Sequence, residues 1–240
     1  MFRALLSSAL VFSFLPSCAD TGPTDELAGE SNDGEAGKDD SADAFTFFAV
    51  TPDVRACSFD ARCGGFFVSR PNRSTTICGR GSTADRCYVD SLDFSGTAMP
   101  DSVAMSYQDR IRAGETFLLR GDISPAPDDR GASLHITEVW VSGSSAGVTD
   151  GVFVLVKDNG VRCITAPCPN VSEQRLNSTR HATIHEIDLS TSGADDATIG
   201  RATSDLFDAG IIIVGDRYYP ARAKGRSANQ FFTKAPVPLF

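Results

Sequence analysis

The sequence predicts a mainly β fold of the α+β class, built as a tandem repeat of two small β-β-β-α-β-β units braced by disulfides. Short segments of strand composition alternate with turn residues from residue 45 onward, and each half of this region has one helical pattern. The motifs of residues 45–147 recur in the same order in residues 150–240. Seven cysteines follow an apolar leader, which indicates an oxidising compartment.

The charge of the chain is concentrated near its N-terminus. The 240 residues contain 22 Lys+Arg and 31 Asp+Glu, a formal net charge of −9, and residues 19–44 alone hold nine acids against one base, a net −8. Because residues 1–18 contribute +1, the rest of the chain carries only −2. This nearly neutral region offers no electrostatic footprint for nucleic acid, so we expect no nucleic-acid partner.

Residues 1–18 have the pattern of an export signal. A basic start is followed by an apolar stretch of 12 residues, Ala4 to Leu15, which suits a secretory signal and is short for a membrane span. The following Leu15-Pro16-Ser17-Cys18 resembles the lipobox of bacterial lipoproteins, which implies that Cys18 is lipidated and becomes the mature N-terminus. We expect a membrane partner through this lipid and a bacterial cell envelope location, in the outer rather than the inner membrane. The alternative is an ordinary secretory signal with Cys18 incidental.

Residues 19–44 are predicted to be a disordered acidic tether. They contain no aromatic residue and a single large aliphatic one, Leu27, so they cannot bury enough apolar surface to offset the entropy of ordering. Fully stretched, this segment spans at most ~90 Å. It would hold the folded region away from a membrane surface.

The first predicted unit contains five strands and one helix. The strands are Phe45–Thr51, Gly65–Ser69, Tyr88–Phe94, Thr116–Ile123 and Leu134–Ser142. The helix spans Pro100–Arg112, because apolar residues recur there at helical spacing and a glycine follows as its stop: Val103, Tyr107, Ile111 and Gly114.

The second unit repeats this order, with its helix predicted at Ala194–Ala209 and Gly210 as the stop. Asn72 lies nine residues after Cys63, and Asn177 lies nine residues after Cys168. Three strands, a helix and two strands is the order of OB-like barrels, which we therefore expect for each unit. The alternative is a pair of curled sheets packed together in an α+β arrangement.

The repeat also suggests how the cysteines pair. The second unit holds only Cys163 and Cys168, so the simplest closure joins them, and the equivalent Cys57 and Cys63 should pair likewise. The remaining two, Cys78 and Cys87, lie within a segment that is inserted in the first unit and should brace it. The spacings fit none of the usual zinc sites, so we expect three disulfides and no metal or other cofactor.

Three motifs in the folded region resemble those of an uncharacterised family of myxobacterial exported and lipid-anchored proteins. They are Cys63-Gly64-Gly65-Phe66-Phe67-Val68, Cys87-Tyr88-Val89, and the run Asp158-Asn159-Gly160-Val161-Arg162-Cys163-Ile164-Thr165-Ala166-Pro167-Cys168-Pro169. The resemblance covers residues 45–240. The family is a domain of unknown function, so it implies export and cysteine pairing but supplies no activity and no catalytic residue.

The sequence points to no catalytic site. The histidines His181 and His185 are four residues apart, but they fall on a predicted strand, where that spacing places them about 13 Å apart. No Gly-x-Ser-x-Gly elbow and no phosphate-binding loop with its lysine occur. We therefore predict a non-enzymatic protein that binds an unidentified protein or envelope component, or serves a structural role.

The loop from Cys163 to Pro169 is a candidate for binding a partner. A short disulfide ring and two prolines lower its entropy before binding, and the candidate contact residues are Ile164, Thr165, Ala166, Pro167 and Pro169. One interpretation is a stabilised strand connection. Another is a recognition loop, even one that presents itself to a protease as an inhibitor. A further alternative for the whole protein is an enzyme with an unrecognised site.

The lipobox predicts that Cys18→Ala releases the protein from the membrane fraction or leaves an uncleaved precursor. Metabolic labelling with radioactive palmitate should disappear in this variant, because the acylated sulfur is lost. Cys163→Ala is the control and should label normally. Unchanged labelling of Cys18→Ala would contradict lipidation at this residue.

Overall fold

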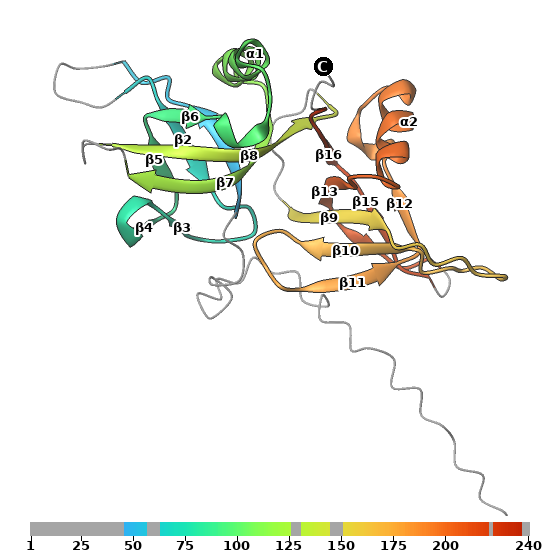
Figure 1. Cartoon of the computed structure of the whole chain (residues 1–240). Helices are drawn as coiled ribbons and strands as arrows, with labels where there is room; N and C mark the ends of the chain where they lie inside the picture. The colour runs from blue at the N-terminus through green and yellow to red at the C-terminus, as the bar shows by residue number, and fades with distance from the viewer. Residues whose placement is uncertain (1–45, 57–62, 126–130, 145–150, 221–222, 237–240) are drawn as a thin grey trace, which may run out of the picture.

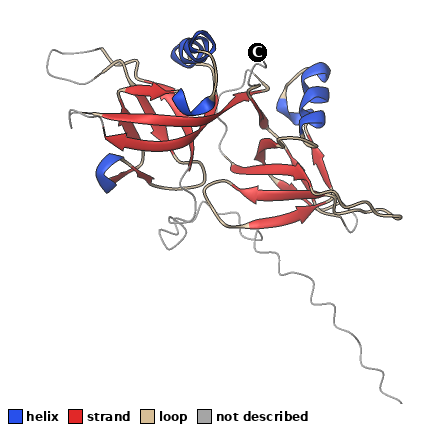
Figure 2. Cartoon of the chain, viewed as in Figure 1, coloured by secondary structure: helices blue, strands red, loops and turns tan. Residues whose placement is uncertain are grey.

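The computed structural model describes residues 46–56, 63–125, 131–144, 151–220 and 223–236. These residues form a mainly β fold, in which one curled sheet of eleven strands runs through the molecule and two α-helices pack beside it (Figures 1 and 2). Residues 46–142 form the first half of this arrangement and residues 152–234 the second half. Neither described α-helix is long and apolar enough to cross a membrane.

The first half begins with β1 and ends with β8. Its strands are β1 (Thr46–Pro52), β2 (Phe66–Ser69), β3 (Thr76–Ile77), β4 (Thr83–Ala84), β5 (Cys87–Val89), β6 (Ser91–Asp93), β7 (Phe117–Pro125) and β8 (Ala132–Ser142). Helix α1 (Asp101–Arg112) lies between β6 and β7.

The second half begins with β9 and ends with β16. Its strands are β9 (Val152–Asp158), β10 (Val171–Arg175), β11 (His181–Ile184), β12 (Glu186–Asp188), β13 (Ile211–Gly215), β14 (Arg217–Tyr218), β15 (Gly225–Ser227) and β16 (Gln230–Lys234). Helix α2 (Asp196–Asp205) lies between β12 and β13.

The two halves have the same strand order. The first half reads β5-β2-β1-β7-β8, with β6 parallel to β8, and the second reads β11-β10-β9-β13-β16, with β12 parallel to β15. The short strands β14 and β15 extend the lines of β13 and β16. Counted along the chain, the third predicted strand of each half is β5 with β6, or β11 with β12, and the fifth is β8, or β15 with β16. In each half the third strand therefore bends round to meet the fifth, which curls the sheet around its own core.

Two glycines lie where β7, and the line of β13 and β14, change register against the neighbouring strand. In β7 the pairing with β8 shifts at Gly121, and Gly215 ends β13 at the corresponding place. A Cβ atom at Gly121 would overlap the carbonyl oxygen of His135, and one at Gly215 would overlap that of Ser227. Only glycine allows the backbones to approach this closely.

Most predicted elements are present with small shifts in their ends. The predicted strand Tyr88–Phe94 is two strands, because β5 pairs with β2 whereas β6 pairs with β8. Asp90 separates them, donating its backbone N–H to the carbonyl of Ala132 and accepting from the N–H of Ala132. Helix α2 begins two residues later than predicted, because the Asp195 side chain caps its N-terminus by accepting from the N–H of Thr198 at 2.7 Å. It also ends earlier, at Asp205, where Phe207 and Asp208 donate to carbonyls three residues back, in turns.

Each half encloses its own apolar core. In the first half the core includes Phe48, Val50 and Phe66, with Ile111 of α1 packed onto it. The core of the second half is formed by Val154, Val156, Ile184, Phe231 and other residues, with Ala202 of α2.

A third apolar cluster lies between the halves. Its buried members are Leu118, Trp140, Phe153, Leu176, Ile212, Val214 and Phe232, with Phe47, Ala49 and Leu155 packed against them. These residues alternate along β1, β9 and β13 with the residues of the two cores. The strands are therefore apolar on both faces, because the outer face of each half is covered by the other half.

The halves are joined directly by antiparallel pairing of β8 with β16. Val141 pairs with Thr233, Trp140 with Lys234, and Ser142 with Phe232. Val141 and Thr233 occupy the same position in their own halves, opposite the first residue of β7 and of β13 respectively. The interface therefore has an approximate twofold symmetry centred on this pair.

Two asparagines continue this symmetry. Asn72 of the first half binds the backbone of the second, accepting from the N–H of Phe153 at 2.9 Å and donating to the carbonyls of Phe153 at 2.7 Å and Leu176 at 3.1 Å. Asn177 of the second half binds the first half in the same way. It accepts from the N–H of Phe47 at 2.9 Å and donates to the carbonyls of Phe47 and Pro71, both at 3.0 Å.

Both asparagines have a left-handed backbone, with φ of 62° at Asn72 and 56° at Asn177. Asparagine tolerates this conformation better than most residues. The turn after the second strand of each half thus directs one amide into the opposite half, and the two halves are held in a defined orientation.

The second half contains a buried group of three charges. Glu173 binds Arg217 through one carboxylate oxygen and Arg226 Nε through the other, the latter at 2.9 Å, and all three side chains are at most 3% exposed. Arg226 also donates to the carbonyl of Gly215 at 2.8 Å. The strand pairings place Val68, Ile123 and Leu134 at the corresponding positions of the first half.

Because the first half has aliphatic residues where the second has these three charges, exchanging one set for the other tests how much the buried charges cost in free energy of unfolding. Replacing only Glu173 with Val leaves two buried guanidinium groups without their carboxylate, and should lower the free energy of unfolding by about 3–5 kcal/mol. The triple variant Glu173→Val/Arg217→Ile/Arg226→Leu recreates the apolar core of the first half, and should match or exceed wild-type stability by about 1–4 kcal/mol. Urea denaturation measures both. A triple variant as unstable as the single one would contradict the expectation.

Candidate functional site

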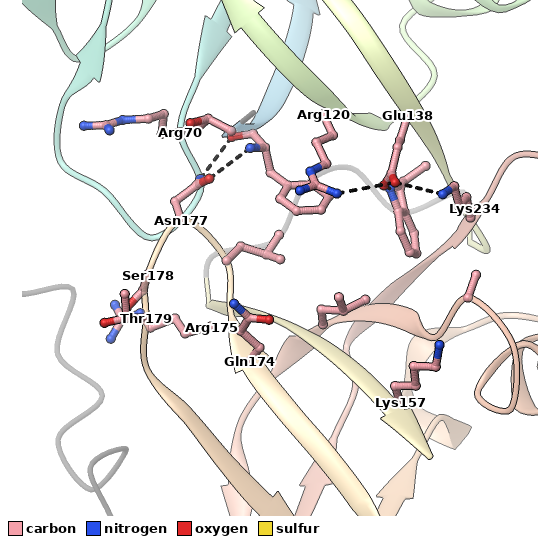
Figure 3. A pocket seen from close by; sticks show the side chains of 16 residues that line it. Arg70, Arg120, Glu138, Lys157, Gln174, Arg175, Asn177, Ser178, Thr179 and Lys234 are labelled. Atoms are coloured by element: carbon pink, nitrogen blue, oxygen red, sulfur yellow. Dashed lines mark hydrogen bonds and ion pairs between the residues drawn. The ribbon is translucent and has the colours of Figure 1, made fainter. Parts of the chain in front are cut away.

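The main candidate site is a pocket of about 660 Å³ between the two halves, named here the inter-half pocket. The first half contributes β1, β7, β8 and the turn after β2. The second half contributes β9, β10, β16, the turn after β10 and the turn after α2 (Figure 3). A volume of this size is within the range of small-molecule sites. The pocket exists only because the two halves are held together.

Basic side chains dominate the charged lining of this pocket. They are Arg70, Arg120, Lys157, Arg175 and Lys234, against a single carboxylate, that of Glu138. Arg70 and Arg175 are more than nine-tenths buried and occupy the same position in the two halves, directly after β2 and at the end of β10. The excess of positive charge favours an anionic ligand.

Glu138 organises one wall of the pocket. Its carboxylate accepts from Lys234 Nζ at 2.8 Å and from Trp140 Nε1 at 3.0 Å, and lies 3.5 Å from Arg120 Nη1 (Figure 3). Burial raises the pKa of Glu138, but the hydrogen bonds from Lys234 and Trp140 outweigh it, so the pKa is lowered overall. The carboxylate is therefore ionised at neutral pH and neutralises part of the charge on this wall.

Lys157 lies on the opposite wall, on β9 (Figure 3). Its side chain is exposed, and its ammonium makes no hydrogen bond or ion pair with any residue that the structure describes. A cation that is already placed in a pocket and carries no internal partner can bind a ligand without breaking an existing interaction. Arg120 and Lys234 face it across the space with part of their donors committed to Glu138.

Neutral polar and apolar groups complete the lining. The hydroxyl and amide side chains are Thr46, Gln174, Asn177, Ser178 and Thr179, and the apolar ones include Phe47, Leu155 and Leu176. Hydroxyls and amides both donate and accept hydrogen bonds, which suits a ligand with many hydroxyl groups. The turn that carries Ser178 and Thr179 is fixed by Asn177, so this part of the pocket is already ordered before a ligand binds.

The structure contains two of the three predicted disulfides. Cys78–Cys87 has a Cα–Cα distance of 5.4 Å and Cys163–Cys168 one of 5.5 Å. The first braces the inserted hairpin of β3 and β4. Cys63 is also in a disulfide, whereas Cys57 lies outside the described residues, so their pairing stays a prediction.

The predicted recognition loop projects from the second half between β9 and β10, at the right of Figure 1. Ile164, Thr165, Ala166 and Pro167 are exposed, Ile164 completely, and Pro169 is half-buried. The inter-half pocket has no residue from this loop. The structure therefore does not bring the loop and the pocket together as one site.

The base of this loop is held by side chains at the end of β9. Asn159 donates from Nδ2 to the carbonyl of Pro169 at 2.9 Å and accepts from the N–H of Val161 at 2.9 Å. Asp158 accepts from the N–H of Gly160 at 2.8 Å and pairs with Arg162. The loop thus combines a fixed base with an exposed apolar tip.

The histidines are not gathered into a site. Among the described residues, no group of three or more His, Cys, Asp or Glu could hold a metal ion. His185 accepts from the N–H of Lys224 and His181 lies exposed at the start of β11. His135 binds Asp93 at 2.9 Å and, with Ser95, lowers the pKa of Asp93 to about 2. Cys18 and residues 19–44 lie outside the described part of the chain.

Sequence reasoning missed the pocket. Its basic residues are spread from Arg70 to Lys234, with no local motif to connect them. The one available signal was the repeated Arg-x-Asn, at Arg70 to Asn72 and Arg175 to Asn177, in which each arginine lines the pocket and each asparagine binds the opposite half. The sequence comparison used these asparagines only to align the two halves.

Comparison with known proteins identifies a family but no function. The model of a family described as a domain of unknown function, DUF6748, matches residues 46–235. This agrees with the family type and the extent that the sequence motifs indicate. No curated protein matches the chain, and no solved structure matches it.

Proposed function

Because the chain belongs to DUF6748, a family of domains of unknown function, we propose its function from the geometry of the inter-half pocket. The protein is a lipid-anchored bacterial envelope protein that binds an anionic, hydroxyl-rich ligand in this pocket. The observation that carries the proposal is the lining, in which five basic side chains and one carboxylate surround about 660 Å³ together with hydroxyl and amide groups. A short anionic glycan, with carboxylates or phosphates along a sugar chain, has this chemistry.

Each part of the lining has a role in this proposal. Lys157 meets an anionic substituent of the ligand directly, since no described residue engages its ammonium. Lys234 and Arg120 bind a second substituent from the other wall, where Glu138 sets their positions. Hydrogen bonds between charged donors and anions contribute about 1.5–3 kcal/mol each, more than neutral pairs.

The proposed role is binding rather than catalysis. Glu138 is the single carboxylate of the described lining, and it is fully engaged by Lys234, Trp140 and Arg120. General acid–base catalysis needs a group that can exchange a proton with the ligand near neutral pH. The lowered pKa of Glu138 argues against that role for it.

The location in the envelope rests on the N-terminal sequence. The lipobox-like Leu15-Pro16-Ser17-Cys18 supports lipidation of Cys18, and the acidic residues 19–44 would then connect the lipid to β1. Anchoring would keep the pocket close to the membrane surface and to its polymers. The outer membrane is the proposed site.

We also propose that the halves are tandem copies of one OB-like unit, spanning residues 45–147 and 150–240. The shared strand order, the parallel contact of the third strand with the fifth, and the matched Gly121 and Gly215 support this. The reciprocal contacts of Asn72 and Asn177 give further support. In this arrangement the pocket is a site that neither copy has alone.

The pocket proposal predicts that Lys157→Gln weakens binding of a short oligogalacturonide roughly tenfold, because one charge-assisted contact is lost. Isothermal titration measures the affinity, and a neutral dextrin of the same length should bind far more weakly. Arg201→Gln, which removes one exposed charge on α2, is the matched control and should bind like wild type. Equal affinity for the two sugars, or an unaltered Lys157→Gln, would overturn the proposal.

A second candidate function belongs to the loop between β9 and β10. The fully exposed Ile164 inside a disulfide ring with a fixed base favours a protein-recognition loop, including one that inhibits a protease. This function would be independent of the pocket.

If the loop inhibits a protease, then a panel of envelope and secreted proteases should contain at least one whose activity the protein suppresses. Ile164→Asp and the pair Ala166→Asp/Pro167→Gly should abolish that suppression, since they change the tip and leave the disulfide in place. Ile77→Asp, at an exposed residue of the β3–β4 hairpin, is the control. The inhibitor function fails if suppression is absent across the panel or survives these loop variants.

A further inference from the structure

We infer that the acidic segment 19–44 is an intramolecular occupant of the inter-half pocket. In this state, carboxylates near the end of the segment bind the basic side chains of the pocket, above all Lys157 and Lys234. The inference rests on the anion affinity that the proposed function gives to the pocket. It adds that the chain carries its own competitor for the external ligand.

The covalent connection places the segment at the pocket. The described chain begins at Thr46, and both Thr46 and Phe47 line the pocket. Asp43 is three residues before Thr46 and Asp39 is seven residues before it. Since a chain spans at most ~3.6 Å per residue, the Cα of Asp43 lies within ~11 Å of the Cα of Thr46, and that of Asp39 within ~25 Å.

The charges of the segment and the pocket are complementary. Residues 19–44 carry a net −8, whereas the rest of the chain after them is nearly neutral. The pocket gathers five basic side chains at the place where this acidic segment joins the fold. Three acids, Asp39, Asp40 and Asp43, fall within the last six residues of the segment.

The linkage makes even weak attraction sufficient. A short tether holds its charges near the pocket at an effective concentration of the millimolar order. Individual exposed ion pairs contribute little, but several of them acting on one covalently held segment raise its occupancy together. The contact should weaken as salt screens it, since the Debye length falls from ≈ 10 Å at 0.1 M to ≈ 3 Å at 1 M ionic strength.

Occupancy of the pocket would then be coupled to the reach of the anchor. While the end of the segment is bound in the pocket, that part of it cannot contribute to the distance between the lipid anchor and the fold. When an external anion displaces it, the 26 residues are released and can extend to at most ~90 Å. Ligand binding and the distance of the fold from the membrane are therefore linked.

Carbodiimide cross-linking of the full chain in detergent tests this contact, because the reagent joins carboxylates to amines that are already in contact. We expect peptides that link Asp39, Asp40 or Asp43 to Lys157 or Lys234, and we expect them to disappear at roughly 0.5 M salt. Lys224, which is outside the pocket lining, is the internal control and should link far less. Equal linking of Lys224, or no links to Lys157 and Lys234, would overturn the inference.

A matched pair of variants gives a second test. Asp39→Asn/Asp40→Asn/Asp43→Asn and Asp20→Asn/Asp25→Asn/Glu26→Gln each remove three charges, but only the first set is near the pocket. The first variant should bind oligogalacturonide roughly fivefold more tightly than wild type, and the second should be unchanged. Identical affinities in the two variants would contradict the inference.

The two proposals fail separately. If oligogalacturonide binds, Lys157→Gln weakens it, and the two tether variants are alike without cross-links, then the pocket function stands and the intramolecular occupant is rejected. If cross-links form as expected but no external anion binds any variant, then the pocket serves the segment alone and the proposed ligand is rejected.

Discussion

The reciprocal hydrogen bonds of Asn72 and Asn177 are the constraint on which the rest of this structure depends. Each amide binds both the N–H and the carbonyl of one phenylalanine in the opposite half, so translation or rotation of one half would break contacts at both places. Both asparagines are half-buried, and each hydrogen bond of this kind contributes about 0.5–1.5 kcal/mol, so the loss of several at once makes such a shift unfavourable. The β8–β16 pairing supplies the line of contact, and the asparagines fix the angle around it.

The pocket follows from this fixed orientation. Arg120 and Glu138 come from the first half, whereas Lys157 and Lys234 come from the second, Lys234 on β16 next to β8. The distance between the side chains of the two halves is set by how the halves dock and not by the geometry of either half alone.

The buried Glu173, Arg217 and Arg226 lie inside the second half, where the same strand order encloses charges in place of aliphatic side chains. One arrangement of strands thus tolerates two different interiors.

The sequence allowed prediction of features that are local or repeated. Strand and helix positions followed from periodicity, and the Cys78–Cys87 and Cys163–Cys168 pairs followed from aligning one half on the other. Contacts between the halves could not be predicted, because the alignment compares the halves and carries no information on how they dock. Glu173 was missed although the alternation in β10 places it on the same face as the buried Val171. An acid on an inward face is interpretable only when its buried partners, here on β14 and β15, are known.

The twofold character of the β8–β16 pairing has a consequence for populations of molecules. Val141 of β8 meets its counterpart Thr233 of β16, so the surface that a half offers is complementary to the partner half of any copy. Two chains that exchange their second halves would form the same β8–β16 contacts as two separate monomers. The contact between the two halves thus resembles the twofold-symmetric contact of a dimer. Wherever many copies are held at high density, domain swapping would therefore compete with the monomer, and protein concentration would set the balance between the two.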